Sequence, residues 1–61
     1  MAISKLRDAK LEGFARETAA DIGEPLEAAI RAMRDEPGEV ARATDIPRAY
    51  VVNWTKRRLT R

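Results

Sequence analysis

Three prolines, at positions 25, 37 and 47, divide this chain into four segments that are each long enough to form a helix. Proline fits the first turn of a helix, where its missing N–H costs no hydrogen bond, and it disfavours helical geometry in the residue before it. Gly23 and Gly38 lie beside two of these prolines and strengthen the breaks. No stretch alternates polar and apolar residues for long enough to form a strand. The sequence therefore predicts an all-α fold, a single small domain of four helices.

Residues 1–36 are expected to form two helices that supply the core and any dimer surface. The first begins at Ser4, a residue type that caps helices well, and continues to about Ala20. The second covers residues 25–36, because Pro37 ends it. At 100° per residue each helix gathers one apolar face. These faces are Leu11, Phe14, Ala15, Thr18 and Ile22 in the first helix, and Leu26, Ala29, Ile30 and Met33 in the second.

Composition excludes several classes of function. The chain has 61 residues and contains neither cysteine nor histidine, which rules out disulfides, thiolate zinc sites and imidazole acid–base chemistry. The acidic residues are scattered, and so short a chain leaves little room for a closed pocket, so we expect no enzyme, cofactor, metal or small-molecule substrate. No apolar run approaches the roughly 20 residues that span a bilayer. We expect a cytoplasmic protein with no membrane partner.

Charge is distributed unevenly along the chain. Residues 1–45 carry seven of the twelve basic side chains and all ten acids, a balance of −3. Residues 46–61 carry the other five basic side chains and no acid, a balance of +5. One explanation is a cationic helix end favoured by the helix dipole. The dipole does not account for the complete absence of acids, so the pattern favours an anionic partner for the last quarter of the chain.

Residues 37–61 meet the requirements of a helix-turn-helix followed by a basic tail. Such a motif needs a small residue in its first helix, a tight turn, an apolar residue after the turn, and two inward apolar residues three apart in its second helix. A short helix is expected over residues 38–43, a turn at Thr44 and Asp45, and a second helix over residues 47–59. The residues that fill the inner positions are Val40, Ala41, Ile46, Val51 and Trp54. The same residues would also be ordinary core residues of a helical bundle. The outer face of the last helix therefore has to distinguish a DNA-binding motif from such a bundle.

The outer face of the last helix carries side chains suited to a DNA major groove. Arginine donates two hydrogen bonds to guanine, asparagine pairs with adenine, and small apolar side chains contact thymine methyl groups. The expected base-reading residues are Arg48, Ala49, Val52, Asn53 and Lys56. The expected phosphate contacts are Tyr50, Arg57, Arg58 and Arg61.

The stretch resembles the helix-turn-helix families of bacterial and phage regulators, including repressors of the Cro type. The order of a helix that begins Glu24-Pro25-Leu26, a short helix, a turn and a basic last helix is similar to the C-terminal domain of the factor for inversion stimulation. Those families usually place glycine where this chain has Asp45, because the backbone there takes a positive φ, which aspartate tolerates better than most residues. The resemblance implies sequence-specific binding of double-stranded DNA by a nucleoid-associated repressor, another transcriptional regulator or a recombination accessory factor.

A homodimer is expected, because one recognition helix makes few contacts and two half-sites roughly double the interface. The candidates for the dimer contact are Leu6, Leu11 and Phe14, which equally well belong to the internal core. The alternative function is a small protein-interaction module, such as a phage or plasmid adaptor or antagonist, whose basic helix grips an acidic protein surface. Membrane-surface or RNA binding is disfavoured, since the last helix has a narrow apolar face and lacks aromatic platforms.

Overall fold

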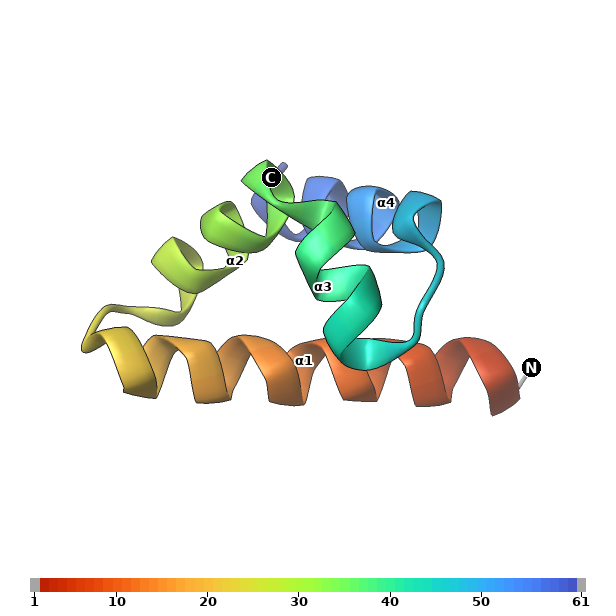
Figure 1. The fold of residues 1–61 in the computed structure, drawn as a ribbon, viewed down its shortest axis with the longest axis horizontal. Coiled ribbons are helices and arrows are strands. Elements are labelled where there is room, and N and C mark those ends of the chain that lie inside the picture. Colours follow the sequence, from red (N-terminus) through yellow and green to blue (C-terminus); the bar gives the residue numbers. More distant parts are fainter. Residues whose placement is uncertain (1, 61) are drawn as a thin grey trace.

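The computed structural model describes the backbone of residues 2–60 and the side chains of residues 5–60, and this part of the chain consists of helices without strands. The helices are α1 (Ala2–Ile22), α2 (Leu26–Asp35), α3 (Pro37–Thr44) and α4 (Arg48–Leu59). The prediction of an all-α fold with four helices is confirmed. Helix α1 runs along one side of the molecule, α2 and α4 form a layer opposite it, and α3 connects the two levels (Figure 1). Among the described residues no helix is long and apolar enough to cross a membrane.

The breaks between helices follow from proline, glycine and one aspartate. Pro25 and Pro47 immediately precede α2 and α4, and Pro37 opens α3. Helix α1 ends at Ile22, and Gly23 directly after it takes a φ of 67° that suits glycine. Asp45 takes a φ of 59° and a ψ of 36° after α3, and its N–H donates to the carbonyl of Ala41 at 2.8 Å. The left-handed residue expected between the last two helices is therefore present at Asp45.

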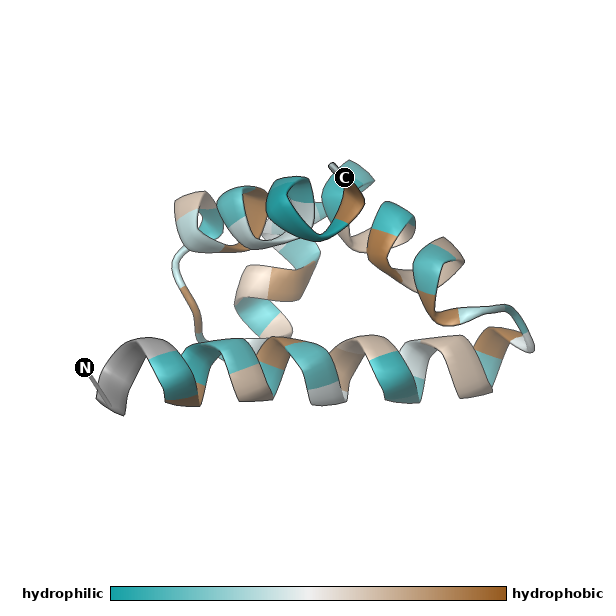
Figure 2. Ribbon diagram, turned by 180° about the vertical axis from the view of Figure 1, so that it is seen from behind, coloured by the Kyte–Doolittle hydropathy of each residue, from teal (hydrophilic) through white to brown (hydrophobic). Residues whose placement is uncertain are grey.

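One apolar core joins all four helices. Helices α1, α2, α3 and α4 all contribute, as does the connection between α3 and α4, and hydrophobic and hydrophilic positions alternate along each ribbon (Figure 2). The core residues are Leu11, Ala15, Ile30, Met33, Val40, Ile46, Val51 and Trp54, with Phe14, Leu26, Tyr50 and Leu59 packed around them. Helix α2 makes extensive contacts with both α1 and α4, and α4 also packs on α3. Helix α1 is therefore held on the rest of the molecule mainly through its contacts with α2.

Two details of α1 differ from the sequence-based expectation. The helix begins at Ala2, so Ser4 lies inside its first turns and is not its cap. Ile22 is half exposed, whereas Ala19 is buried. The chain turns back at Gly23, and α2 therefore covers α1 one turn before its end and leaves the last turn in solvent.

Two buried threonines have their hydroxyl groups satisfied within their own helices. Thr44 donates to the carbonyl of Val40 at 2.6 Å, and Thr55 lies within hydrogen-bond distance of the carbonyls of Val51 and Val52 at 3.1 and 3.0 Å. A hydroxyl bonded in this way can be buried without the cost of an unpaired polar group. No buried side-chain nitrogen or oxygen lacks a partner in the described part of the chain.

Candidate nucleic-acid interface

The inner side of α4 holds this helix against the rest of the molecule. Val51 and Thr55 are completely buried and Trp54 is 4% exposed. These positions lie three and four residues apart and therefore share one face of the helix. The inward placement predicted for Val51 and Trp54 is thus observed. The burial of Thr55 was not predicted, because threonine is polar and the sequence does not show that its hydroxyl bonds to carbonyls of its own helix.

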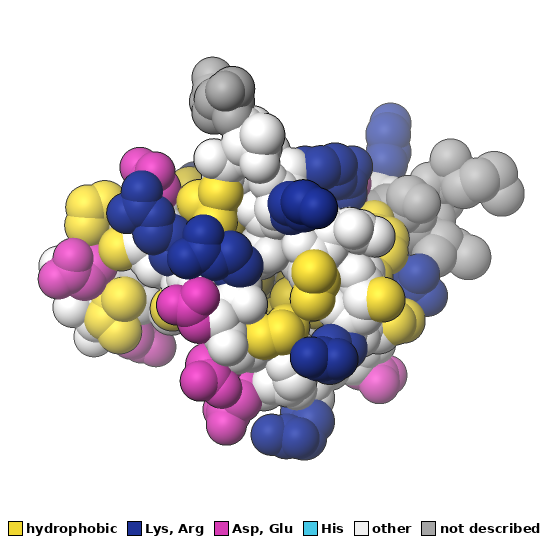
Figure 3. Space-filling view, turned by 90° about the horizontal axis from the view of Figure 1, so that it is seen from above, with side chains coloured by type: hydrophobic (Ala, Val, Ile, Leu, Met, Phe, Trp, Pro, Cys, Tyr) yellow, Lys and Arg dark blue, Asp and Glu magenta, His cyan; other side chains and the backbone are white. Residues whose placement is uncertain are grey.

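The outer side of α4 is exposed along its whole length. The five residues expected to read bases are all exposed: Arg48, Ala49, Val52, Asn53 and Lys56. Figure 3 views the molecule from the side of α2 and α4, where basic side chains border much of a group of apolar ones and acidic side chains lie along its remaining edge. Helix α4 contains no acidic residue. Within residues 5–60, Arg48, Lys56 and Arg57 take part in none of the ion pairs, which leaves three cations on α4 for an external anion.

The residues expected inside the helix-turn-helix occupy the region where α3, α4 and their connection meet. Val40 and Ile46 are each only 3% exposed, and Ala41 is half-buried. Ile46 follows the left-handed Asp45 directly, so the turn carries its side chain into the core. Helix α4 is consequently held at both its start and its middle by apolar packing.

Tyr50 and Arg58 differ from the expectation that both contact phosphates. The Tyr50 hydroxyl donates to Oδ1 of Asp8 at 2.6 Å, and the guanidinium of Arg7 lies 5.3 Å from the centre of the Tyr50 ring. Arg58 forms an ion pair with Glu12. Both polar groups on α4 are therefore used inside the molecule, and the assignment of Tyr50 and Arg58 to phosphate is not supported by their placement.

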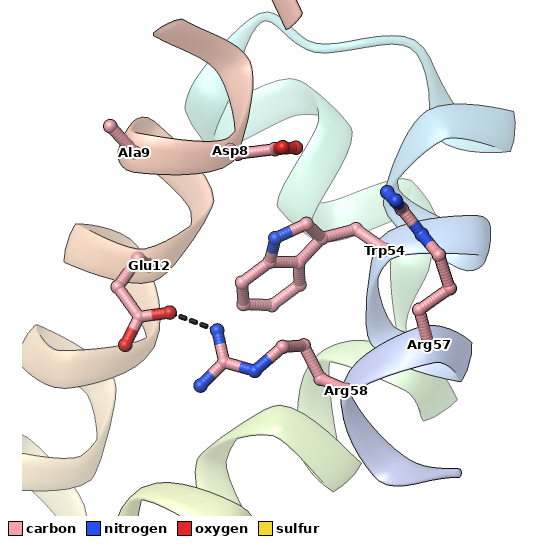
Figure 4. A pocket seen from close by; sticks show the side chains of 6 residues that line it. All are labelled: Asp8, Ala9, Glu12, Trp54, Arg57 and Arg58. Atoms are coloured by element: carbon pink, nitrogen blue, oxygen red, sulfur yellow. Dashed lines mark hydrogen bonds and ion pairs between the residues drawn. The ribbon is translucent and has the colours of Figure 1, made fainter. Parts of the chain in front are cut away.

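The contact between Arg58 and Glu12 closes one end of a shallow hollow between α1 and α4. The hollow measures about 440 Å³ and is lined by Asp8, Ala9, Glu12, Trp54, Arg57 and Arg58 (Figure 4). The Arg58 guanidinium lies 5.0 Å from the Trp54 ring, in the range of a cation–π contact. Hydrogen bonding to Arg58 is the main cause that holds the pKa of Glu12 below its ordinary value, and Arg16, 3.3 Å away, adds to it. The contacts Tyr50–Asp8 and Arg58–Glu12 thus fix α4 on α1.

Sequence reasoning missed Asp8 and Glu12 as partners of α4. Their spacing of four residues places both on one face of α1, which was the only available signal.

No family of known proteins, no curated protein and no solved structure matches this chain. The described residues include no group of three or more acidic side chains that could hold a metal ion.

The other residues predicted to contact phosphates or a second subunit differ in their exposure. Arg57 is exposed, as a phosphate contact requires, and Arg61 lies outside the described residues. Leu6 is 68% exposed and Phe14 is half-buried, whereas Leu11 is fully buried in the core of its own chain. Leu11 therefore has no surface to offer a second subunit, which corrects its assignment as a dimer contact.

Proposed function

We propose that this protein binds double-stranded DNA, with α3 and α4 acting as a helix-turn-helix and α4 entering the major groove. The observation that carries this proposal is the two-sided character of α4. Its inner side is fixed by buried Val51 and Trp54, while its outer side presents an exposed arginine, asparagine and lysine with no acid on the helix. A rigid helix with a free polar face is the element that major-groove readers use.

The exposed residues of α4 have separate roles in this proposal. Arg48 and Asn53 are suited to hydrogen-bond guanine and adenine, and Val52, which is 37% exposed, suits a thymine methyl group. Lys56 and Arg57 follow toward the end of the helix, where they reach the phosphate backbone. Each phosphate contact releases bound counterions, so affinity should fall as salt rises.

In this role the protein acts as a homodimer and serves as a transcriptional repressor, another transcriptional regulator or a recombination accessory factor in the nucleoid. Two copies of α4 would contact two half-sites about 34 Å apart, one turn of the duplex. A dimer is favoured because a single helix of this size makes too few base contacts for tight specific binding.

The test is titration of a labelled random-sequence duplex at two salt concentrations, followed by fluorescence anisotropy. A variant with Arg48→Ala, Asn53→Ala and Lys56→Ala should lose binding while its circular dichroism stays helical. The matched control carries Arg31→Ala and Arg42→Ala, which removes the same charge from exposed sites on α2 and α3. The control should keep most of the affinity and a similar dependence on salt.

Once an operator is selected from random DNA, Arg48→Ala and Asn53→Ala should each weaken specific binding by about 1–3 kcal/mol with little change in stability. Equal losses in the α4 variant and the control would show that binding follows net charge alone. No binding by the wild type at low salt would refute the proposal and favour the protein-interaction module, whose acidic partner would then be sought.

A further inference from the structure

A shallow groove, made of two adjoining open hollows, lies along α1 on the side of α3. One hollow of about 310 Å³ is lined by residues of α1 and the end of α3, and another of about 200 Å³ continues it toward the connection after α3. Both hollows are lined by Lys10, so they adjoin. We call this surface the α1/α3 groove, and its residues on α1 are Leu6, Arg7, Lys10, Gly13, Phe14 and Glu17.

The α1/α3 groove exposes apolar surface that nothing in the described chain covers. Leu6 is 68% exposed, more than any other large hydrophobic residue that the structure describes. A side chain added at Gly13 would meet no atom within 4 Å, so the groove is open at that point. Phe14 lies beside Gly13 and is only half-buried. An open apolar strip of this kind is suited to contact another helix.

The charges along the groove suit an identical helix that runs in the opposite direction. Lys10 and Glu17 both line the groove, and neither forms an ion pair within residues 5–60. They are two turns apart on one side of α1, too far apart to pair with each other. In an antiparallel pair of α1 helices, Lys10 of each copy meets Glu17 of the other, so the same attraction forms twice.

We infer that two copies of this chain pair through the α1/α3 groove with their α1 helices antiparallel. In the register that joins Lys10 to Glu17, residue numbers in opposite positions add up to 27. Gly13 then faces Phe14 of the second copy, and the open space at glycine lets the exposed edge of the Phe14 ring approach while the rest of the ring stays on its own core. Leu6 lies opposite Asp21 and the neighbouring Ala20 in the last turns of α1 of the second copy, which cover part of its exposed side chain.

This pairing leaves α4 free. The residues of α1 that bind α4, Asp8 and Glu12, lie about half a turn of the helix away from Lys10 and Glu17. Helix α4 therefore flanks the opposite side of α1. In each copy α2 and α4 lie on one side of α1 (Figure 1), and a two-fold axis perpendicular to the plane of the paired α1 helices keeps both α2/α4 layers on one side of the dimer. The use of this dimer on DNA rests on the proposed function, whereas the pairing itself does not.

The experiment measures molecular mass by sedimentation equilibrium in the absence of DNA. The wild type should be a dimer in equilibrium with a monomer. Lys10→Glu and Glu17→Lys should each weaken dimerisation by about ten- to thirtyfold, because two attractions between helices become two repulsions of similar size. An equimolar mixture of these two variants should form a heterodimer as stable as the wild-type dimer, since both cross-helix pairs are then attractive again.

The matched control is Lys5→Glu, which reverses the same kind of charge on an exposed part of α1 about 140° around the helix from Lys10. This control should dimerise like the wild type, and circular dichroism should show all variants equally helical. A wild type that stays monomeric into the millimolar range, or a mixture that fails to recover dimer, would overturn the inference. A monomer that still binds duplex DNA would overturn the dimer alone, and a dimer without affinity for DNA would overturn only the proposed function.

Discussion

Asp45 offers a direct test of how the chain turns from α3 into α4. Its backbone lies in the left-handed region at a φ of 59°, and it is the only described residue other than glycine with a positive φ. Its side chain is exposed, so substitution removes no buried contact. The backbone N–H that donates to Ala41 is retained by every residue except proline. Replacing Asp45 therefore changes mainly the backbone energy and one charge.

Three effects set the expected magnitudes. A left-handed backbone costs about 1–2 kcal/mol for an ordinary residue, less for aspartate or asparagine, and nothing for glycine. Glycine gives back about 0.5–1 kcal/mol because its unfolded chain is more flexible. The negative charge of Asp45 at the end of α3 opposes the helix dipole by about 0.3–1 kcal/mol. Asp45→Gly and Asp45→Asn should therefore stabilise the fold by up to about 1 kcal/mol, and Asp45→Ala should be less stable than Asp45→Gly by about 1 kcal/mol.

Thermal unfolding followed by circular dichroism measures these differences. For a domain of this size about 1 kcal/mol corresponds to a Tm change of about 4–8 °C. Arg7 and Lys10 line the same hollow as Asp45, and their attraction reduces the gain from removing the charge. Both charge effects weaken in high salt, so the difference between the glycine and alanine variants should remain there. An alanine variant as stable as the glycine variant in high salt would refute the left-handed turn.

Three further substitutions test the packing of α4. Trp54→Ala should destabilise the fold by about 3–5 kcal/mol in urea unfolding, because the indole is buried and Arg58 stacks on it; a loss under about 1 kcal/mol would contradict this packing. Tyr50→Phe should cost about 1–2 kcal/mol through the lost bond to Asp8 and leave DNA affinity unchanged, whereas a loss of affinity without a loss of stability would return Tyr50 to the phosphate contacts. Glu12→Gln should cost no more than about 1 kcal/mol, since Arg58 is partly exposed. Because the pKa of Glu12 is lowered in the folded state, its ion pair stabilises the fold at neutral pH and this contribution disappears as pH falls through that pKa, so wild type and Glu12→Gln should converge in acid.

The helices and the buried side of α4 were predictable because the signals are local. Proline and glycine act on the backbone next to them, so the breaks at Gly23, Pro37 and Pro47 follow from the sequence without knowledge of the fold. The three-residue spacing of Val51 and Trp54 is set by the geometry of a single helix. The exposure of the residues on the opposite face of α4 follows from the same geometry.

Tertiary structure alone decided which side chains α4 shares with α1. Tyr50 and Arg58 meet partners 42 and 46 residues earlier in the chain, and no local pattern specifies the angle at which α4 crosses α1. That angle results from packing the whole core, which also covers Leu11 and Ala19 and leaves Leu6 and Ile22 in solvent. The sequence by itself determined the number of helices, the breaks between them and which face of α4 is charged. The packing of α1 across the other helices decided which of those charges are bound inside the molecule and which stay available to a partner.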